Sequence, residues 1–388
     1  MKKQTVGVFF GSRSTEHDVS IITAISSVIK PLKLSGKYEV VPVYIAKDGT
    51  WYSDPKLADI TTYTSGAIDN VLKKLKPVAL EVGNGLRLTQ TGLRNKVISI
   101  DIAFPATHGT HGEDGELMAL FELANIPYVG CNVPASAIAM DKVLAKQIAA
   151  SHGISVTKFV TASKVDYEAE PKKWLTKIEK ELKYPLFVKP PHLGSSIGIS
   201  KVTNKTELEN AIEVALHYDD KVLVEEGVQN LVEVTLPIMG NEEPVPALLE
   251  QPLTHAEDFF DFETKYMQGG KKGKGGKNAK SGSQGYSQIP ADLPKKLYEA
   301  AEETGIATYK ALGCTGIARV DMLIDTKKSA IYFNEVNPLP GGLYAHNWNK
   351  AGYSNIELVQ KLISYAASLH KEKTVRTTNF ATNYLKQF

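Results

Sequence analysis

A lysine that ends an apolar strand and is followed within five positions by a loop of small residues is the first feature of this sequence suited to chemistry. Residues 188–199 are VKPPHLGSSIGI, so Lys189 precedes Gly194, Ser195 and Ser196. Glycine lets backbone N–H groups approach phosphate oxygens, serine hydroxyls add donors, and lysine supplies charge. The spacing differs from the P-loop pattern, which disfavours a P-loop kinase. A plain strand–turn–strand hairpin is the alternative, but the lysine at the strand end favours phosphate binding.

Two predicted strands near the C-terminal end each carry polar side chains on one face. In ARVDMLID, Arg319 and Asp321 share a face because side chains alternate along a strand, and in IYFNEVNP the same holds for Glu335 and Asn337. Neighbouring strands would bring these groups together, and such oxygen ligands suit Mg²⁺ held against nucleotide phosphates. The alternative is a cross-strand ion pair with Arg319 on a solvated face. Two strands with the same pattern favour the metal site.

Two polar turns near the N-terminal end offer weaker signals. The turn HGTHGEDG contains His108 and His111 and leads into a helix, whose N-terminus can bind a carboxylate or phosphate. The turn GSRSTEHDVS contains Glu16 and Asp18. Ser14 or Thr15 fits a helix cap, with Asp18 in the first turn of the helix. Glu16 is the carboxylate that we expect to hold an ammonium group.

The elements that must position these residues alternate between strands and helices, which predicts an open α/β sheet up to about residue 140 and α+β units after it. Ligands of such sheets usually lie at the strand ends, where the turns above occur. The expected strands are 5–10, 40–45, 97–104, 157–161, 186–190, 222–226, 232–238, 244–250, 316–324 and 330–335. The expected helices begin near Val19 and cover 114–125, 143–151, 291–312 and 355–370.

Length and composition limit the class of protein. With 388 residues, the chain exceeds what one core usually organises. The net charge of +2 argues against nucleic acid or an anionic membrane as the main partner. Only two cysteines are present, which fits a reducing compartment and gives no disulfide framework or zinc site. No window offers about 18 uninterrupted apolar residues. We therefore expect no membrane span and a cytoplasmic location.

Residues 269–285 differ from the rest of the chain. They read GGKKGKGGKNAKSGSQG and hold too little apolar surface to order themselves. A surface loop or linker is the plain interpretation. A lid over residues 267–287 is the second, because the segment follows Tyr266 and its lysines would close over polyphosphate. A nucleic-acid-binding arm is the weakest, since no aromatic residues are interleaved.

In this order, the motifs resemble the D-alanine–D-alanine ligase family of ATP-grasp enzymes and its D-lactate and D-serine relatives. The resemblance runs from about residue 5 to 370 and rests on GSRSTEHDVS, HGTHGEDG, PYVGCNVPASAIAMDK, VKPPHLGSSIGISKV, FDFETKY, ARVDMLID and NEVNPLPG. It implies an N-terminal substrate domain (1–140), a central ATP-grasp subdomain (141–230) and a C-terminal metal-binding domain (231–388). It also implies ATP, two Mg²⁺ ions with Mn²⁺ as an alternative, D-alanine as substrate, and a homodimer.

The resemblance assigns roles residue by residue. The residues implied at ATP are Lys142, Phe187, Lys189, Ser195, Ser196, Glu225, Val228, Glu233, Phe259 and Lys265. The implied metal ligands are Asp321, Glu335 and Asn337. The first D-alanine is expected at Glu16, in a set with Ser195 and Tyr266 and with His108 nearby. Arg319 and the Gly341 N–H are expected to stabilise the oxyanion.

The implied reaction forms an acyl phosphate from the first amino acid and ATP, and the second amino acid's amine then displaces phosphate. One departure affects that second step. The family usually has a serine that helps to bind the second substrate's carboxylate, and His346 stands at its position. D-alanine is the expected acceptor, and D-lactate, D-serine or another amino acid stays open. A non-catalytic nucleotide-binding or nucleic-acid-binding protein is disfavoured by the joint presence of Lys189, Arg319, Asp321, Glu335 and Asn337.

Overall fold

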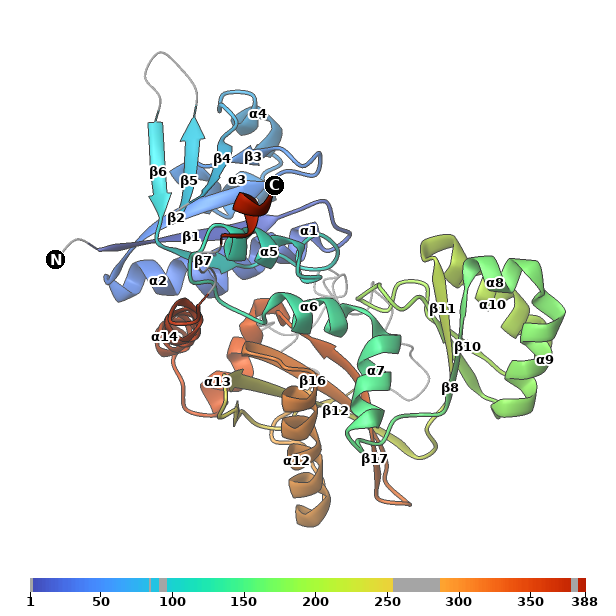
Figure 1. Cartoon of the computed structure of the whole chain (residues 1–388). Coiled ribbons are helices and arrows are strands. Elements are labelled where there is room, and N and C mark those ends of the chain that lie inside the picture. The colour runs from blue at the N-terminus through green and yellow to red at the C-terminus, as the bar shows by residue number, and fades with distance from the viewer. Residues whose placement is uncertain (1–2, 84, 91–95, 254–286, 378–382) are drawn as a thin grey trace.

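The computed structural model describes residues 3–83, 85–90, 96–253, 287–377 and 383–388. Its first sheet is the expected open α/β sheet, with β1 paired in parallel to both β2 and β7 (Figure 1). In spatial order it contains β3 (Trp51–Tyr52), β2 (Tyr38–Ile45), β1 (Gln4–Gly11) and β7 (Ile102–Pro105). β1 is buried almost throughout, as expected for a parallel strand covered on both faces. The helical elements of this part are α1 (His17–Ile22), the π-helical η1 (Thr23–Ile29), α2 (Lys30–Ser35), η2 (Pro55–Ala58), α3 (Thr61–Thr64), α4 (Ile68–Leu72) and α5 (Glu116–Leu123).

The single strand expected over 97–104 is wrong. The chain forms two strands there, which belong to different sheets and are separated at Asp101. The Asp101 carboxylate accepts a hydrogen bond from the Thr5 N–H at 2.7 Å and so fixes the switch between sheets. The additional sheet is antiparallel and consists of β4 (Ala79–Gly83), β5 (Gly85–Gln90) and β6 (Lys96–Ile100).

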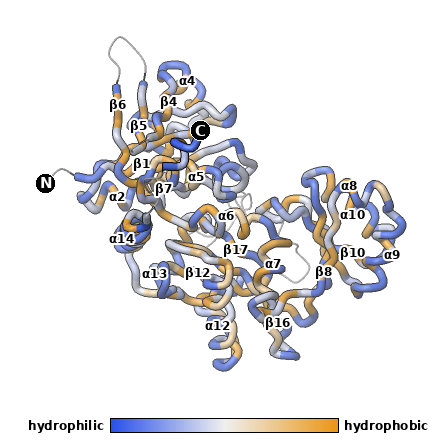
Figure 2. Tube along the Cα trace, viewed as in Figure 1, coloured by the Kyte–Doolittle hydropathy of each residue, from blue (hydrophilic) through white to orange (hydrophobic). Residues whose placement is uncertain are grey.

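The second large sheet is antiparallel and carries its helices on one side, as the green part of Figure 1 shows. Its strands are, in spatial order, β10 (Ser200–Val202), β9 (Leu186–Lys189), β11 (Lys221–Glu226) and β8 (Phe159–Ser163). Its helices are α8 (Lys164–Ala169), α9 (Pro171–Glu181) and α10 (Lys205–Tyr218). Leucine, isoleucine, valine and alanine side chains of both layers form one buried core. Hydrophobic residues run along the strands, whereas hydrophilic residues gather on the outer turns (Figure 2).

The third large sheet is also antiparallel and holds the two strands with same-face polar pairs. Its strands are, in spatial order, β13 (Val245–Pro246), β12 (Leu231–Gly240), β16 (Gly316–Asp325) and β17 (Ala330–Asn337). The elements packed against it are α6 (Val133–Met140), α7 (Lys142–Ser151) and α12 (Lys295–Ala311). The strand expected over 244–250 is largely wrong, because the two prolines Pro244 and Pro246 lack the N–H groups that extend a ladder.

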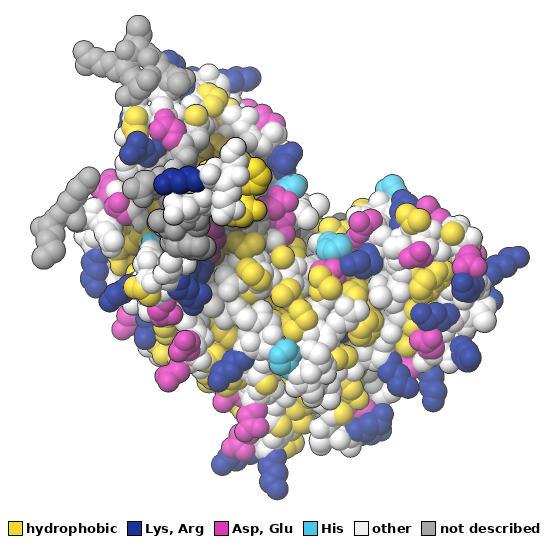
Figure 3. Space-filling view, in the orientation of Figure 1, with side chains coloured by type: hydrophobic (Ala, Val, Ile, Leu, Met, Phe, Trp, Pro, Cys, Tyr) yellow, Lys and Arg dark blue, Asp and Glu magenta, His cyan; other side chains and the backbone are white. Residues whose placement is uncertain are grey.

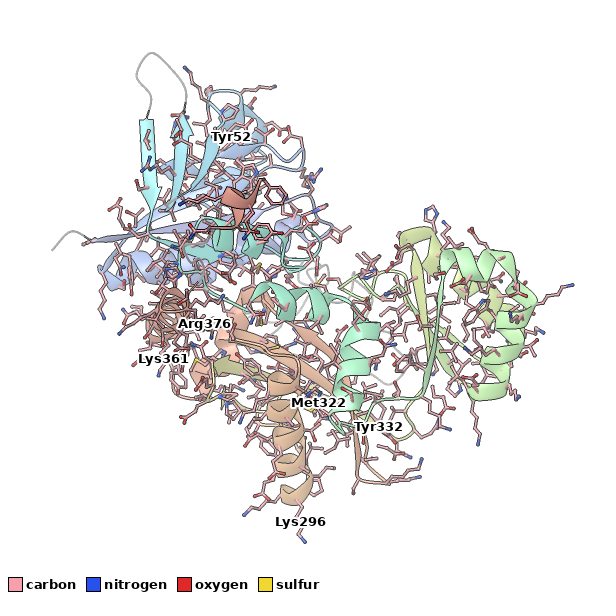
Figure 4. All side chains as sticks on the ribbon, in the orientation of Figure 1. Tyr52, Lys296, Met322, Tyr332, Lys361 and Arg376 are labelled. Atoms are coloured by element: carbon pink, nitrogen blue, oxygen red, sulfur yellow. The ribbon has the colours of Figure 1, made fainter. Side chains whose placement is uncertain are left out.

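The end of the described chain returns to the first sheet. Helix α14 (Asn355–Thr374) begins at a capping box between Ser354 and Glu357 and packs against α2 within the first core. The remaining elements are β14 (Gln251–Pro252), β15 (Ser287–Gln288), η5 (Gly341–Tyr344), α13 (Ala345–Lys350) and η6 (Tyr384–Gln387). Lys296 of α12 and Lys361 of α14 point outward from the ribbon (Figure 4). Each large sheet lies in one of the ranges 1–140, 141–230 and 231–388, whose limits as domains stay a prediction. Among the described helices, none has the length and apolarity needed to cross a membrane.

A close backbone contact joins the segment before α6 to the start of β16. Gly316 has φ +68°, and a Cβ there would lie 2.8 Å from the Gly130 carbonyl oxygen and 2.9 Å from its nitrogen. We expect Gly316→Ala to lower the free energy of unfolding by about 3 kcal/mol, because a left-handed backbone and overpacking each cost roughly 1–2 kcal/mol. Urea unfolding followed by circular dichroism measures the loss.

Gly313 offers a matched control. Its φ is +67°, but nothing lies within 4 Å of the position that a Cβ would occupy there. Gly313→Ala should therefore cost only the backbone part, about 1 kcal/mol. Equal losses in the two variants would contradict the proposed packing role of Gly316.

Candidate active site

The loop between β9 and β10 has a backbone that departs from a simple turn. Ser195 and Ser196 have φ values of +53° and +59°, and Gly198 has +72°. A Cβ at Gly198 would lie 3.0 Å from Pro190 Cγ, so the loop folds back closely on its own start. β9 and β10 do pair as a hairpin, as the plain alternative predicted. Lys189 is the last residue of β9 and so lies where the loop between the two strands begins.

The N-terminus of α7 is bound to this loop at two points. The backbone N–H of Lys142 donates to the Pro191 carbonyl oxygen at 3.3 Å, and its Nζ donates to the Leu193 carbonyl oxygen at 2.8 Å. The same Nζ lies 3.0 Å from Oε2 of Glu335 on β17. One lysine thus connects the loop of the second sheet to a predicted metal ligand on the third.

A buried charge cluster lies beneath the loop. The Glu225 carboxylate contacts the ammonium groups of both Lys189 and Lys146, the latter at 2.9 Å, and accepts a hydrogen bond from Thr157 Oγ1 at 2.5 Å. Burial would raise the pKa of Glu225, but the two lysines lower it well below its ordinary value. Burial likewise opposes the charge of Lys189, yet Glu225 raises its pKa, so both groups are ionised. Burial lowers the pKa of Lys146.

His192 joins the loop to the start of α7 and to the end of α10. Its Nδ1 lies 2.8 Å from Asp219 Oδ1, and its backbone N–H donates to the other oxygen of that carboxylate at 2.9 Å. Its Nε2 lies 3.3 Å from Asp141, which also pairs with Lys221 at 2.6 Å. Asp141 caps α7 by accepting hydrogen bonds from the first-turn N–H groups. Hydrogen bonds to Asp141 and Asp219 raise the pKa of His192 to about 9.

The predicted metal ligands meet across β16 and β17. Asp321 is the register partner of Glu335, and Arg319 is the partner of Asn337, which confirms the same-face geometry inferred from alternation. Arg319 binds Asp321 through two hydrogen bonds of 2.7 and 2.5 Å, and Asn337 Nδ2 donates to Asp321 at 3.2 Å. The Arg319–Asp321 ion pair lies within β16, and the Arg319 side chain is only 17% exposed, so this pair differs from the cross-strand pair on a solvated face that was the alternative.

This donor set fits a hard divalent cation. Two carboxylates and an amide oxygen on adjacent strands are the oxygen ligands that Mg²⁺ prefers. The two carboxylates are balanced by Arg319 and Lys142. Asp321, Glu335 and Asn337 would hold Mg²⁺, and their role as ligands stays a prediction.

Glu16, in the turn between β1 and α1, reaches the loop that joins β9 to β10. Ser195 Oγ donates a hydrogen bond to Glu16 Oε1. Two glycines allow this approach, since a Cβ at Gly109 or Gly194 would lie 2.9 or 3.0 Å from Glu16 Oε2. The contact confirms the expected proximity of Glu16 and Ser195. The space-filling view shows a hollow between the first and second sheets (Figure 3).

His108 is a buried member of a hydrogen-bonded chain. Its Nδ1 lies 2.7 Å from Glu113 Oε1, and its Nε2 lies 2.8 Å from Thr23 Oγ1. The Thr23 hydroxyl also accepts from the Gly342 N–H at 2.9 Å. Burial raises the pKa of Glu113, and His108 opposes that rise. His108 therefore positions the backbone beside Gly341 through Thr23, in addition to any contact with substrate.

His346 is paired with a buried carboxylate. Its Nε2 lies 2.9 Å from Glu250 Oε2, and Asn347 Nδ2 donates to the same oxygen at 3.2 Å. The imidazole also packs on the ring of Tyr344, with a centroid separation of 4.7 Å. On the same tyrosine ring lies the Arg319 guanidinium, 5.1 Å from its centroid. His346 is thus one aromatic ring away from the arginine of the predicted metal site.

The residues predicted around adenine and ribose lie near Lys189. Phe187 is the register partner of Glu225, and its ring centroid is 6.0 Å from the Lys189 ammonium. Val228 is half-buried after β11, and Glu233 on β12 is close enough to favour the charge of Lys189. Three further predicted residues, Phe259, Lys265 and Tyr266, lie outside the described residues, as do residues 269–285 and nearly all of the expected lid 267–287.

The structure adds residues that the sequence did not single out. Lys146 could have been found, since it lies one turn after Lys142 on the apolar face of α7. Glu250, Thr157 and Asp219 carried no comparable signal, because their partners lie 96, 68 and 27 positions away in sequence.

The three sheets, with a lysine-led loop facing paired carboxylates, define an ATP-grasp ligase. A D-alanine–D-alanine ligase from Coxiella burnetii superposes with a TM-score of 0.78 at 28% identity over 97% of each chain. The VanG D-Ala:D-Ser ligase from Enterococcus faecalis gives 0.77 at 34% identity, covering 94% of this chain and 100% of that chain.

Sequence comparison gives the family. Residues 5–131 match the family described as D-ala D-ala ligase N-terminus, and residues 148–364 match D-ala D-ala ligase C-terminus. The D-alanine–D-alanine ligase of Chlorobium limicola is 37% identical over 382 residues, with 94% of this chain and 98% of the relative covered. That of Thermosipho melanesiensis is 36% identical over 384 residues, with 98% of each covered. The chain belongs to the D-alanine–D-alanine ligase family.

The His192 contacts predict a pH-dependent part of stability. Because the folded state holds the His192 proton more tightly than the unfolded chain, the contribution is complete below the ordinary histidine pKa of 6.5 and is lost as pH rises through about 9. The unfolding midpoint of the wild type should therefore fall as pH rises from 6.5 to about 9, and His192→Asn should reduce that fall. Thermal unfolding across that range measures it.

The exposed His152 at the end of α7 provides the control, as His152→Asn leaves the Asp141 and Asp219 contacts in place. A wild-type decline that survives unchanged in His192→Asn would refute the role of this histidine.

Proposed function

We propose that this chain ligates two D-alanines with ATP, through an acyl phosphate, to give D-alanyl-D-alanine, ADP and phosphate for peptidoglycan precursors. The observation that carries the proposal is Lys142, whose Nζ contacts both the Leu193 carbonyl oxygen and the Glu335 carboxylate. This lysine connects the loop suited to phosphate with the carboxylates suited to Mg²⁺. Full-length similarity to D-alanine–D-alanine ligases supports the choice of substrate.

The residues divide the work by charge. Lys142 and Lys189 would stabilise the phosphates of ATP, with Ser195 and Ser196 adding donors from the loop. Mg²⁺, which the family uses with ATP, supplies charge neutralisation at the transferring phosphoryl group. We propose two ions at Asp321, Glu335 and Asn337, with Mn²⁺ as a substitute.

Glu16 would hold the ammonium of the first D-alanine. Ser195 donates a hydrogen bond to the Glu16 carboxylate and so would fix its orientation. Arg319 and the Gly341 N–H would stabilise the oxyanion when the second amine attacks the acyl phosphate. Phe187, Glu225, Val228 and Glu233 would surround the nucleoside. We also propose a cytoplasmic location and a homodimer, the latter testable by sedimentation equilibrium.

Phosphate release and product mass test the activity. Purified protein with ATP, Mg²⁺ and D-alanine should release phosphate and yield D-alanyl-D-alanine. L-alanine should give neither phosphate nor dipeptide. With D-serine or D-lactate as the second substrate, the amount of mixed product should be smaller than the amount of D-alanyl-D-alanine formed from D-alanine alone. Absence of phosphate release with every D-alanine-containing pair would refute the proposal.

Glu335→Gln tests the metal assignment. Loss of one carboxylate should reduce turnover about 100-fold or more, since metal neutralisation supplies several kcal/mol. The Mg²⁺ concentration needed for half-maximal rate should rise as well. Asp292→Asn, which removes an exposed carboxylate before α12, is the control. Normal Mg²⁺ dependence in Glu335→Gln would show that the ligands lie elsewhere.

A further inference from the structure

The pairing of His346 with Glu250 fixes which ring nitrogen carries a proton. The Glu250 side chain is 6% exposed and accepts hydrogen bonds from both His346 and Asn347. Burial would raise the pKa of Glu250, but these donors lower it, so the group is a carboxylate. A carboxylate can only accept, and Nε2 of His346 must therefore be the protonated nitrogen. In the neutral imidazole, Nδ1 is then an unprotonated acceptor.

That acceptor nitrogen is available for a ligand. The side chain of His346 is 21% exposed, and among the described residues none forms a hydrogen bond with its Nδ1. The titratable and charged groups around the ring are Glu250, Tyr344 and, beyond Tyr344, Arg319 with Asp321. Burial raises the pKa of Tyr344 to about 12, so the tyrosine beside His346 is neutral near pH 7.

The backbone before His346 is strained in a way that sets its position. Gly342, Leu343 and Tyr344 have φ values of +59°, +55° and +52°, and only the first is glycine. The conformation is held by hydrogen bonds from the Gly342 N–H to Thr23 Oγ1 and from the Leu343 N–H to the Pro340 carbonyl oxygen, both at 2.9 Å. Leu343 is fully buried. Strain of this kind persists where surrounding contacts over-determine a functional position.

We propose that His346, oriented by Glu250, accepts the proton of the second amino acid's ammonium group. The inference rests on the ligase function proposed above. The second D-alanine enters as an ammonium ion, which cannot attack a carbonyl. Nδ1 takes one proton, and the free amine forms the C–N bond at the acyl phosphate carbonyl. The C–O bond to phosphate then breaks, and the departing phosphate takes the proton that the new amide nitrogen loses.

This role bears on acceptor choice. A hydroxy acid carries no ammonium proton for His346 to remove, and its hydroxyl is a poor nucleophile in the absence of stronger activation. A neutral imidazole at this position therefore favours amine acceptors over D-lactate.

The test separates the two half-reactions of the full-length protein. Hydroxylamine is uncharged near neutral pH and traps acyl phosphates, so it replaces the second D-alanine without needing a proton acceptor. His346→Gln should lower kcat/KM for dipeptide formation by about 10²-fold near pH 7 and remove the acid limb of its pH profile, in line with general-base catalysis. In the same variant, the rate of hydroxamate formation from one D-alanine should stay within about 3-fold of the wild-type rate, a much smaller change than the loss in dipeptide formation.

Glu250→Gln is the second variant and keeps the shape of the side chain. Loss of its negative charge should move the acid limb to lower pH, a shift that a merely structural role would not produce. His152→Gln, at the exposed end of α7, should leave both reactions and both profiles unchanged.

Three results would overturn the inference. His346→Gln could retain the acid limb, could lose hydroxamate and dipeptide equally, or could raise only KM for the second D-alanine. The last would make His346 a carboxylate contact without proton transfer. Failure of the ligase function itself is distinguishable, because wild-type protein would then form neither dipeptide nor hydroxamate.

Discussion

The buried carboxylate of Glu225 is the interaction on which the rest of the site depends. Lys146 is fully buried on α7, and Lys189 is nearly so at the end of β9. Burying an unpaired ammonium group in such a place would destabilise the fold by several kcal/mol. Here the Glu225 carboxylate forms an ion pair with both lysines. Because α7 packs on the third sheet while β9 and β11 belong to the second, this cluster also ties the two sheets together.

Carboxylates are also paired with cations nearer the surface of the site. Arg319 neutralises Asp321, and Lys142 neutralises Glu335. Cations suited to phosphate and carboxylates suited to Mg²⁺ thus compensate each other on the third sheet and at the β9–β10 loop. A nucleotide bound with Mg²⁺ brings charges of both signs, so these groups can change partners without leaving either sign buried alone. This is how the fold keeps a highly charged site stable before ligand binds.

Local geometry made part of the site predictable from sequence. Strand alternation alone put Arg319 and Asp321 on one face of their strand, because the period of two is fixed by the backbone. The register that sets Asp321 opposite Glu335 came only from the structure. The strand break at Asp101 escaped the same reasoning, since periodicity does not reveal a change of sheet. The partners of His192 and His346 were likewise hidden. Asp219 and Glu250 become meaningful only after packing brings distant elements together, and neither has a motif of its own.

His346 shows why a departure from a family pattern needs its surroundings before it can be interpreted. As a substitution for serine, it indicated a changed carboxylate contact and left the second substrate open. With Glu250 buried behind it and left-handed Leu343 and Tyr344 before it, the imidazole is held in one orientation and one tautomer. A side chain that merely filled the serine's space would need neither the buried anion nor the strained backbone. The buried anion and the left-handed backbone thus hold in one place the imidazole that we propose as the proton acceptor for the second ammonium group.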